Sequence, residues 1–69
     1  MTKKQIIEGI RDYGYKANYK NIVWLQNKDN EIVGALMYVS NHSEVYFKIE
    51  KGQILKVKSY EDVKPLIFG

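Results

Sequence analysis

The first thirteen residues carry the hydrophobic pattern of an amphipathic helix. Apolar side chains recur at helical spacing, at Ile6, Ile7, Ile10 and Tyr13. Thr2 and Gln5 fit a capping box, in which each side chain satisfies a backbone N–H group at the start of the helix. Gly14 follows at a position where a left-handed residue ends a helix without steric cost. The pattern therefore predicts a helix from Thr2 to Tyr13.

After Gly14 the pattern changes to that of strands. Four runs rich in β-branched and aromatic residues follow, at Asn21–Asn27, Ile32–Ser40, Glu44–Glu50 and Gln53–Ser59. Polar residues separate them: Asp29-Asn30, Asn41-His42, and the three-residue loop 50–52, in which Gly52 takes the left-handed bulge position. Because every connection is short, we expect consecutive strands to pair antiparallel in a meander.

The last residues predict a short C-terminal helix or tail. Ser59 is a good N-cap, and Glu61 and Asp62 favour the positive end of a helix. Pro65 limits that helix to about one turn, so Leu66 to Phe68 are expected to pack as an apolar tail. The fold class is therefore α+β, with the N-terminal helix packed on a four-stranded antiparallel meander, in a single domain spanning residues 1–69.

The predicted turns determine which side chains share a face of the sheet. They place Val23 opposite Leu36, Leu36 opposite Phe47, and Phe47 opposite Leu55. One face then contains Val23, Leu25, Leu36, Phe47, Ile49, Leu55 and Val57, and the first helix is expected to cover it. The other face contains Ile22, Trp24, Val33, Ala35, Met37, Val39, Tyr46, Lys48, Ile54, Lys56 and Lys58. This second face is too apolar to be left in water.

Three explanations for the second apolar face remain open. The tail from Pro65 to Phe68 could fold over it, a second copy could pair with it in a homodimer, or a different macromolecule could dock on it. In the last case the candidate interaction face consists of Trp24, Met37, Tyr46, Lys48, Ile54 and Lys56. Its aromatic residues and Met37 would act as anchors, and its lysines would favour a protein with an acidic surface.

Composition and charge narrow the class of protein. Hydrophobic residues make up 45% of the chain and charged residues 28%, which is typical of a folded domain. Cysteine is absent, which excludes disulfides and thiolate metal sites and favours a cytoplasmic location. No continuous signal-peptide core and no membrane-length apolar run is present. The net charge of +3 is concentrated at both ends, around an acidic middle.

No motif for catalysis or for a cofactor is apparent. His42 is the only histidine, it lies in a predicted turn, and the chain offers neither a credible triad nor a metal-ligand set. Phosphate-binding glycine loops are absent as well. We therefore predict a protein that is not an enzyme and that needs no cofactor or metal.

Two functional hypotheses follow. The first is a small intracellular binding protein that occupies a surface of another protein; its Lys-, Tyr- and Asn-rich composition resembles that of phage and mobile-element proteins, many of which inhibit host proteins. The second is a binder of single-stranded nucleic acid, in which aromatic rings stack on bases while lysines follow the phosphates. Interleaved tyrosines and lysines at residues 13–20 and on the same sheet face motivate this alternative.

Overall fold

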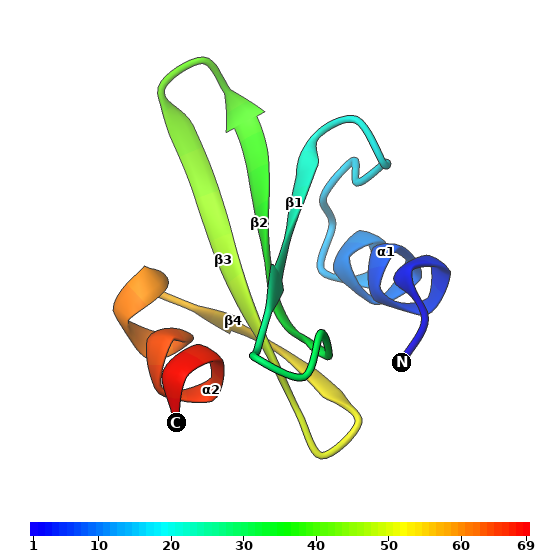
Figure 1. The fold of residues 1–69 in the computed structure, drawn as a ribbon. Coiled ribbons are helices and arrows are strands. Elements are labelled where there is room, and N and C mark those ends of the chain that lie inside the picture. The colour runs from blue at the N-terminus through cyan, green and yellow to red at the C-terminus, as the bar shows by residue number, and fades with distance from the viewer.

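A computed structural model describes residues 1–69 and confirms the predicted α+β fold. The elements are helix α1 (Lys3–Asp12), strands β1 (Ile22–Gln26), β2 (Ile32–Ser40), β3 (Ser43–Glu50) and β4 (Gln53–Val57), the 3-10 turn η1 (Tyr60–Asp62) and helix α2 (Lys64–Phe68). The strands pair antiparallel in the order β1-β2-β3-β4, which is the predicted meander. The two helices lie on opposite sides of this sheet (Figure 1).

Helix α1 begins and ends where the sequence predicts. The backbone N–H of Gln5 donates to Thr2 Oγ1 at 3.1 Å, and the N–H of Thr2 donates to Gln5 Oε1 at 2.8 Å. Both bonds of the capping box are therefore formed. At the other end Tyr13 caps the helix, and Gly14 takes the left-handed conformation with φ of 102°.

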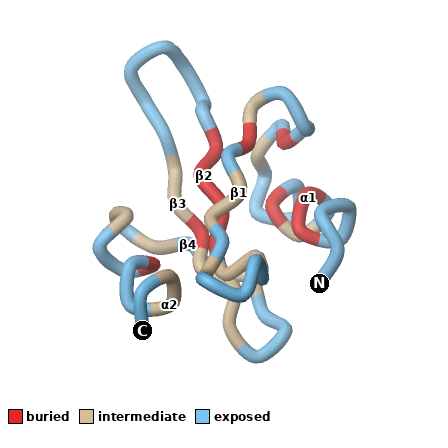
Figure 2. Tube along the Cα trace, viewed as in Figure 1, coloured by how far each residue is buried: buried red, intermediate tan, exposed pale blue.

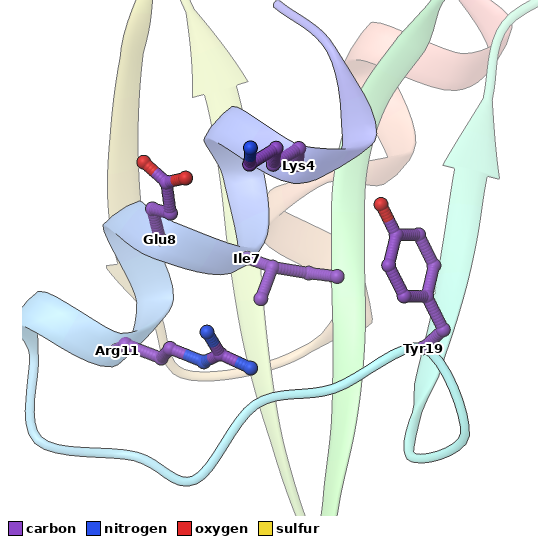
Figure 3. A pocket seen from close by; sticks show the side chains of 5 residues that line it. All are labelled: Lys4, Ile7, Glu8, Arg11 and Tyr19. Carbon is purple, nitrogen blue, oxygen red and sulfur yellow. The ribbon is translucent and has the colours of Figure 1, made fainter.

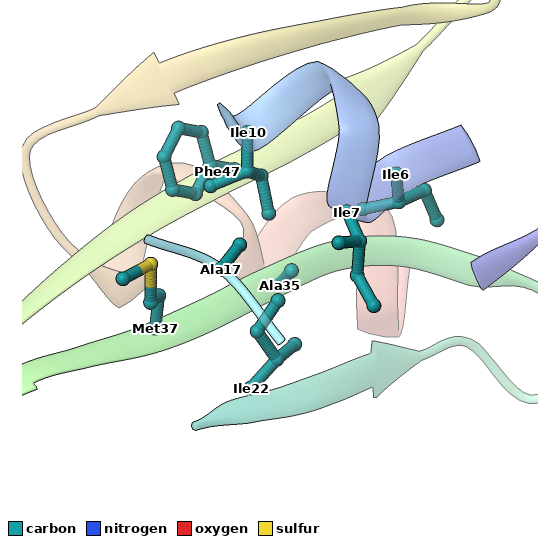
Figure 4. Packing of buried hydrophobic residues seen from close by; sticks show 8 residues of the cluster. All are labelled: Ile6, Ile7, Ile10, Ala17, Ile22, Ala35, Met37 and Phe47. Carbon is teal, nitrogen blue, oxygen red and sulfur yellow. The ribbon is translucent and has the colours of Figure 1, made fainter. Parts of the chain in front are cut away.

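The core lies between α1 and the face of the sheet that α1 covers (Figure 4). It consists of Ile6, Ile7 and Ile10 from α1, Ala17 from the connection, and Ile22, Ala35, Met37 and Phe47 from the first three strands. Gly9 lets α1 approach β4 closely, because a Cβ atom there would collide with the end of the Ile54 side chain. Burial is concentrated around this contact, and the loops are exposed (Figure 2).

The predicted register between β1 and β2 is confirmed, but the register between β2 and β3 is wrong by one residue. Val23 pairs with Leu36 as expected. At the next turn Ser40 pairs with Ser43, but Tyr38 pairs with Glu44, so Val39 is an extra residue on β2. This bulge places Tyr46 opposite Leu36, where the sequence prediction had Phe47.

The turn between β3 and β4 also differs from the prediction. Glu50 pairs with Gln53, so Lys51 and Gly52 alone form the turn, with φ of 53° and 74°. Two positive φ angles are the signature of a type I′ hairpin turn. The expected three-residue loop with a bulge at Gly52 is therefore wrong, and Phe47 lies opposite Lys56 instead of Leu55.

The first shift exchanges the faces of β3 relative to β1 and β2, because a shift of one residue moves each side chain to the other face. The second shift returns β4 to its predicted faces. The face covered by α1 contains Ile22, Trp24, Ala35, Met37, Phe47, Ile54 and Lys56. The opposite face contains Val23, Leu25, Leu36, Tyr46, Lys48, Leu55 and Val57. The predicted core face is therefore wrong, apart from Phe47 and Ile49, which do pack on the α1 side.

The C-terminal segment covers part of the face opposite α1. Val63, which follows η1, is fully buried, and a Cβ atom at Gly34 would lie 2.5 Å from its Cγ1 atom. Because Gly34 and Ala35 are neighbours on β2, they face opposite sides of the sheet. Ala35 faces α1, and Gly34 faces Val63. Pro65 lies in the first turn of α2, where its missing N–H costs nothing. The tail thus folds onto the sheet, but not onto the face that contains Trp24.

Candidate functional site

The six residues predicted as one interaction face lie on two faces of the sheet. Trp24, Met37, Ile54 and Lys56 lie on the side of α1, and Tyr46 and Lys48 lie on the opposite side. Met37 is only 3% exposed and belongs to the core. The prediction that these six residues share one face is therefore wrong. The bulge at Val39 causes the error, and no residue type in the sequence indicates that bulge.

An apolar surface remains open on the face opposite α1, beyond the part that Val63 covers. One row of paired residues crosses all four strands: Val23, Leu36, Tyr46 and Val57. Leu36 is buried, but Val23 is 42% exposed, and Tyr38 on the next row is 49% exposed. We call the surface formed by Val23, Tyr38, Tyr46 and Val57 the open face.

The open face is close to neutral in charge. Lys48 Nζ lies 3.5 Å from Glu50 Oε1, two residues along the same strand, which forms the one ion pair in the structure. The Tyr46 hydroxyl donates a hydrogen bond to Glu44 Oε1 at 2.5 Å. That bond, with smaller contributions from burial and from the charge of Glu44, raises the pKa of Tyr46 above its ordinary value of 10.0. The sequence predicts that Lys48 favours a partner with an acidic surface, but Glu50 balances its charge in the structure.

A second surface, on the side of α1, carries the basic character. Lys4, Ile7, Glu8 and Arg11 from α1 and Tyr19 from the connection to β1 line a depression of about 200 Å³ (Figure 3). Ile7 and the Tyr19 ring form its apolar walls, and Lys4, Glu8 and Arg11 project from one side of the helix. Arg11 is held in place because its Nε donates to the Ala17 carbonyl at 2.9 Å. We call this depression the basic groove.

The groove continues into an aromatic cluster at β1. The Tyr19 and Trp24 rings lie 6.4 Å apart between centroids, and Lys3 Nζ lies 5.5 Å from the centroid of the Trp24 ring. The predicted interaction face omits Lys4, Glu8 and Arg11, although their spacing at i, i+4 and i+7 is a sequence signal for a shared helix face. What the sequence could not provide is the position of Tyr19 across from these side chains.

Lys56 takes part in a similar contact elsewhere on the α1 side. Its Nζ lies 5.5 Å from the centroid of the Tyr15 ring, and that ring packs edge-on against Phe47. Tyr13 packs on Phe47 as well, and its hydroxyl donates to the Ile54 carbonyl on β4 at 2.7 Å. Both tyrosine rings therefore pack on Phe47 at the edge of the core, and the Tyr13 hydroxyl also binds the backbone of β4.

The side chains that could bind a metal ion are not gathered in one place. His42 is exposed in the turn between β2 and β3, and no three side chains of His, Asp or Glu lie close enough to hold a metal ion. That the protein is not an enzyme stays a prediction. Neither helix has the length and apolar character needed to cross a membrane.

Comparisons with known proteins give no family for this fold and these surfaces. No protein-family model matches the chain, and no curated protein and no solved structure matches it.

Proposed function

We propose that the chain is a small binding protein whose open face docks on another protein. The observation that carries the proposal is the row of apolar side chains across all four strands, exposed at Val23 and, on the adjoining row, at Tyr38. Exposed apolar patches of this kind on small proteins commonly mark interaction sites.

The total exposed surface supports the same proposal. The chain exposes 4872 Å², whereas a compact monomer of its mass exposes about 4500 Å². Only 11 of the 69 residues are buried, because α2 is a single short helix that cannot cover its side of the sheet as α1 does. A partner on the open face would complete this burial.

The nature of the open face favours a protein over a nucleic acid. Lys48, which lies on the same face of β3 as Tyr46, is paired with Glu50, and Glu44 adds negative charge beside Tyr46. Phosphates would find no unpaired cation among these side chains, whereas an apolar protein surface would find Tyr38 and Tyr46, residues of a type common in binding hot spots. A second copy and a different protein both satisfy this chemistry.

The test uses two matched substitutions on opposite sides of the sheet. Tyr38→Asp changes the open face, and Tyr19→Asp makes the same change at a tyrosine that is 61% exposed on the α1 side. Light scattering over a range of concentrations comes first. A mass of twice 8.1 kDa that Tyr38→Asp abolishes and Tyr19→Asp preserves identifies the partner as a second copy.

If the chain is monomeric, a photo-crosslinking residue at Val23 tests for a different protein. A discrete adduct in cells of the source organism is expected, and Tyr38→Asp should remove it. A crosslinker at Lys64, an exposed position on α2, serves as the positional control. Equal adducts from both positions, or adducts that are indifferent to Tyr38→Asp, would contradict docking on the open face.

Binding of single-stranded nucleic acid is the second candidate, and the cations beside Trp24 and Tyr19 are the observation that favours it. It has less support, because Lys3 and Tyr19 already occupy the surroundings of the Trp24 ring that stacking bases would need. It predicts binding to a poly-dT oligonucleotide that weakens steeply with salt and is reduced by Tyr19→Asp. Absence of binding at low salt would exclude it. The role as a phage-like inhibitor and the cytoplasmic location stay predictions from composition.

A further inference from the structure

The sheet has two edges, β1 and β4, and β1 is the one whose unpaired backbone groups are not protected by a charged residue or a proline. The Tyr38 N–H donates to the Asn21 carbonyl at 2.9 Å. The N–H and C=O groups of successive residues in a strand point alternately to its two sides. The backbone groups of Val23 and Leu25 therefore also bond to β2, whereas those of Ile22 and Trp24 point away from the sheet. The strand Ile22–Gln26 is short and its register with β2 shifts between Leu25 and Gln26, but it contains no charged residue and no proline to block a further strand.

The other edge, β4, is protected. The Tyr13 hydroxyl binds the Ile54 carbonyl at 2.7 Å, which occupies one of the strand's acceptors. Lys56 lies in the middle of this strand and adds a charge. The contrast between the two edges shows that β1 is the one suited to pair with a further strand.

The side chains next to β1 define the charge that such a strand should carry. Lys3 lies over the Trp24 ring, and Lys4 and Arg11 line the basic groove beside Tyr19. Since the one ion pair of the structure joins Lys48 and Glu50, none of these three cations has a carboxylate within 4.0 Å. Glu8 is the one acid of the groove, so the surface next to β1 keeps an excess of positive charge.

We propose that β1 binds an extended acidic segment of another protein, which adds to the sheet as a fifth strand beside β1. Its backbone would bond to Ile22 and Trp24, as in other cases of strand addition. Its side chains on the α1 side would be carboxylates directed toward Lys3 and the basic groove. Those on the other side would be apolar and would lie beside Val23, which is 42% exposed. The segment is thus one in which acidic and apolar residues alternate.

A second copy of the chain fits this edge less well. Antiparallel pairing of two β1 strands centred on Trp24 uses the whole strand. It brings the turn that contains Lys20 of each copy toward the turn that contains Lys28 of the other, beyond both ends of the new ladder. Like charges that approach at both ends disfavour this pairing. An acidic segment turns the same lysines into attractive contacts.

The probe for this site is a dye-labelled decapeptide of alternating glutamate and valine, and the control peptide has lysine in place of glutamate. We expect the glutamate peptide to bind and the lysine peptide not to bind. Lys4→Glu should weaken binding about three- to tenfold, because it reverses one exposed charge at the groove. Lys64→Glu makes the same charge change on α2, on the other side of the sheet, and should leave the affinity unchanged.

Backbone hydrogen exchange followed by NMR distinguishes strand addition from general attraction of an acidic peptide. Peptide binding should slow exchange of the outward Trp24 amide, whereas the Val23 and Leu25 amides, already bonded to β2, should change little. The proposal is refuted if the Trp24 amide is unaffected by the bound peptide or if both peptides bind alike. The proposal is also refuted if Lys4→Glu and Lys64→Glu lower the affinity for the glutamate peptide equally, or if this peptide does not bind at millimolar concentration.

Two further outcomes separate this site from the alternatives. A dimer whose Trp24 amide is protected without peptide would assign the edge to a second copy and overturn the proposal. Tyr38→Asp should leave peptide binding intact, because Tyr38 lies on β2 and the site at the β1 edge uses only Val23 of the open face. Failure of the open-face experiments would therefore not contradict strand addition at β1. Likewise, failure of the peptide experiments would not contradict docking on the open face.

Discussion

The contact between Gly34 and Val63 holds the C-terminal segment on the sheet, and a pair of substitutions tests it. A Cβ atom at Gly34 would lie 2.5 Å from Val63 Cγ1 and 2.8 Å from the Phe47 carbonyl oxygen. Gly34→Ala therefore forces Val63 or the backbone of β3 to move. Overpacking of this kind costs about 1–3 kcal/mol, which the lower entropy of the unfolded alanine chain offsets by roughly 0.5–1 kcal/mol. We expect a net loss of about 1–2 kcal/mol.

Val63→Ala weakens the same contact by leaving a cavity. Val63 is fully buried, and the substitution removes two methyl groups. Each buried methyl group contributes about 0.8 kcal/mol, and the cavity adds to the loss, so the expected cost is roughly 2 kcal/mol. In the double variant the new methyl group at position 34 enters the space that Val63 Cγ1 vacates. The double variant should therefore be more stable than the sum of the single losses predicts, by about 1 kcal/mol.

Urea unfolding followed by circular dichroism gives the four free energies of this cycle. The total stability of a chain of this length is about 3–10 kcal/mol, so each loss is large enough to measure. Ile10→Val, on the α1 side of the sheet, is the control and should combine with Gly34→Ala additively, within about 0.5 kcal/mol. If Gly34→Ala and Val63→Ala were also additive, Val63 would not lie over Gly34 and the placement of the C-terminal segment would be wrong.

Two further predictions concern local hydrogen bonds. Thr2→Ala removes the capping-box acceptor for the Gln5 N–H and should lower the free energy of unfolding by about 1 kcal/mol, measured in the same urea experiment. An unchanged urea midpoint would show that the capping box does not stabilise α1. Glu44→Ala removes the acceptor of the Tyr46 hydroxyl and should return the pKa of Tyr46 toward 10.0, measured by phenolate absorbance against a Tyr46→Phe reference. Because the native pKa is raised, this hydrogen bond stabilises the fold below pH 10, and its contribution is lost as the pH rises through the raised value. A Tyr46 titration that does not change with Glu44→Ala would refute this cause.

The helix, the strands and their order could be predicted from the sequence because each depends on local chemistry. Thr2 and Gln5 form the cap that their spacing predicts, and Gly14 takes the positive φ that ends the helix. The strand boundaries agree within a residue or two, since the polar turns between the apolar runs set them. These features need no knowledge of what packs against them.

The faces of the sheet could not be predicted, because they depend on single residues in two turns. Val39 is β-branched and fits a regular strand, so its role as the extra residue of a bulge carries no local signal. Lys51 has a φ of 53°, which is uncommon for a side chain of its kind, so the sequence favours a longer loop there. Each error moves the next strand's side chains to the other face.

The candidate interaction face failed for the same reason, and the correction changes what a partner can do. The prediction combined apolar anchors and lysines on one surface, which would serve a protein with an acidic patch and a nucleic acid equally well. In the structure the apolar residues Val23 and Tyr38 lie opposite α1, whereas Lys3, Lys4 and Arg11 lie on its side. The two kinds of surface therefore require partners of different chemistry.

The position of β1 links these two surfaces. Its residues alternate between them, with Val23 on the open face and Trp24 beside Lys3 and Tyr19. A strand added at this edge would extend the open face by one strand and, on its other side, meet the unpaired cations. A partner with an acidic segment next to an apolar surface could therefore bind the β1 edge and the open face together. Its affinity would exceed that of either contact alone, because the second contact becomes intramolecular once the first has formed. Loss of one contact, through Tyr38→Asp or Lys4→Glu, would then weaken such a partner without abolishing its binding.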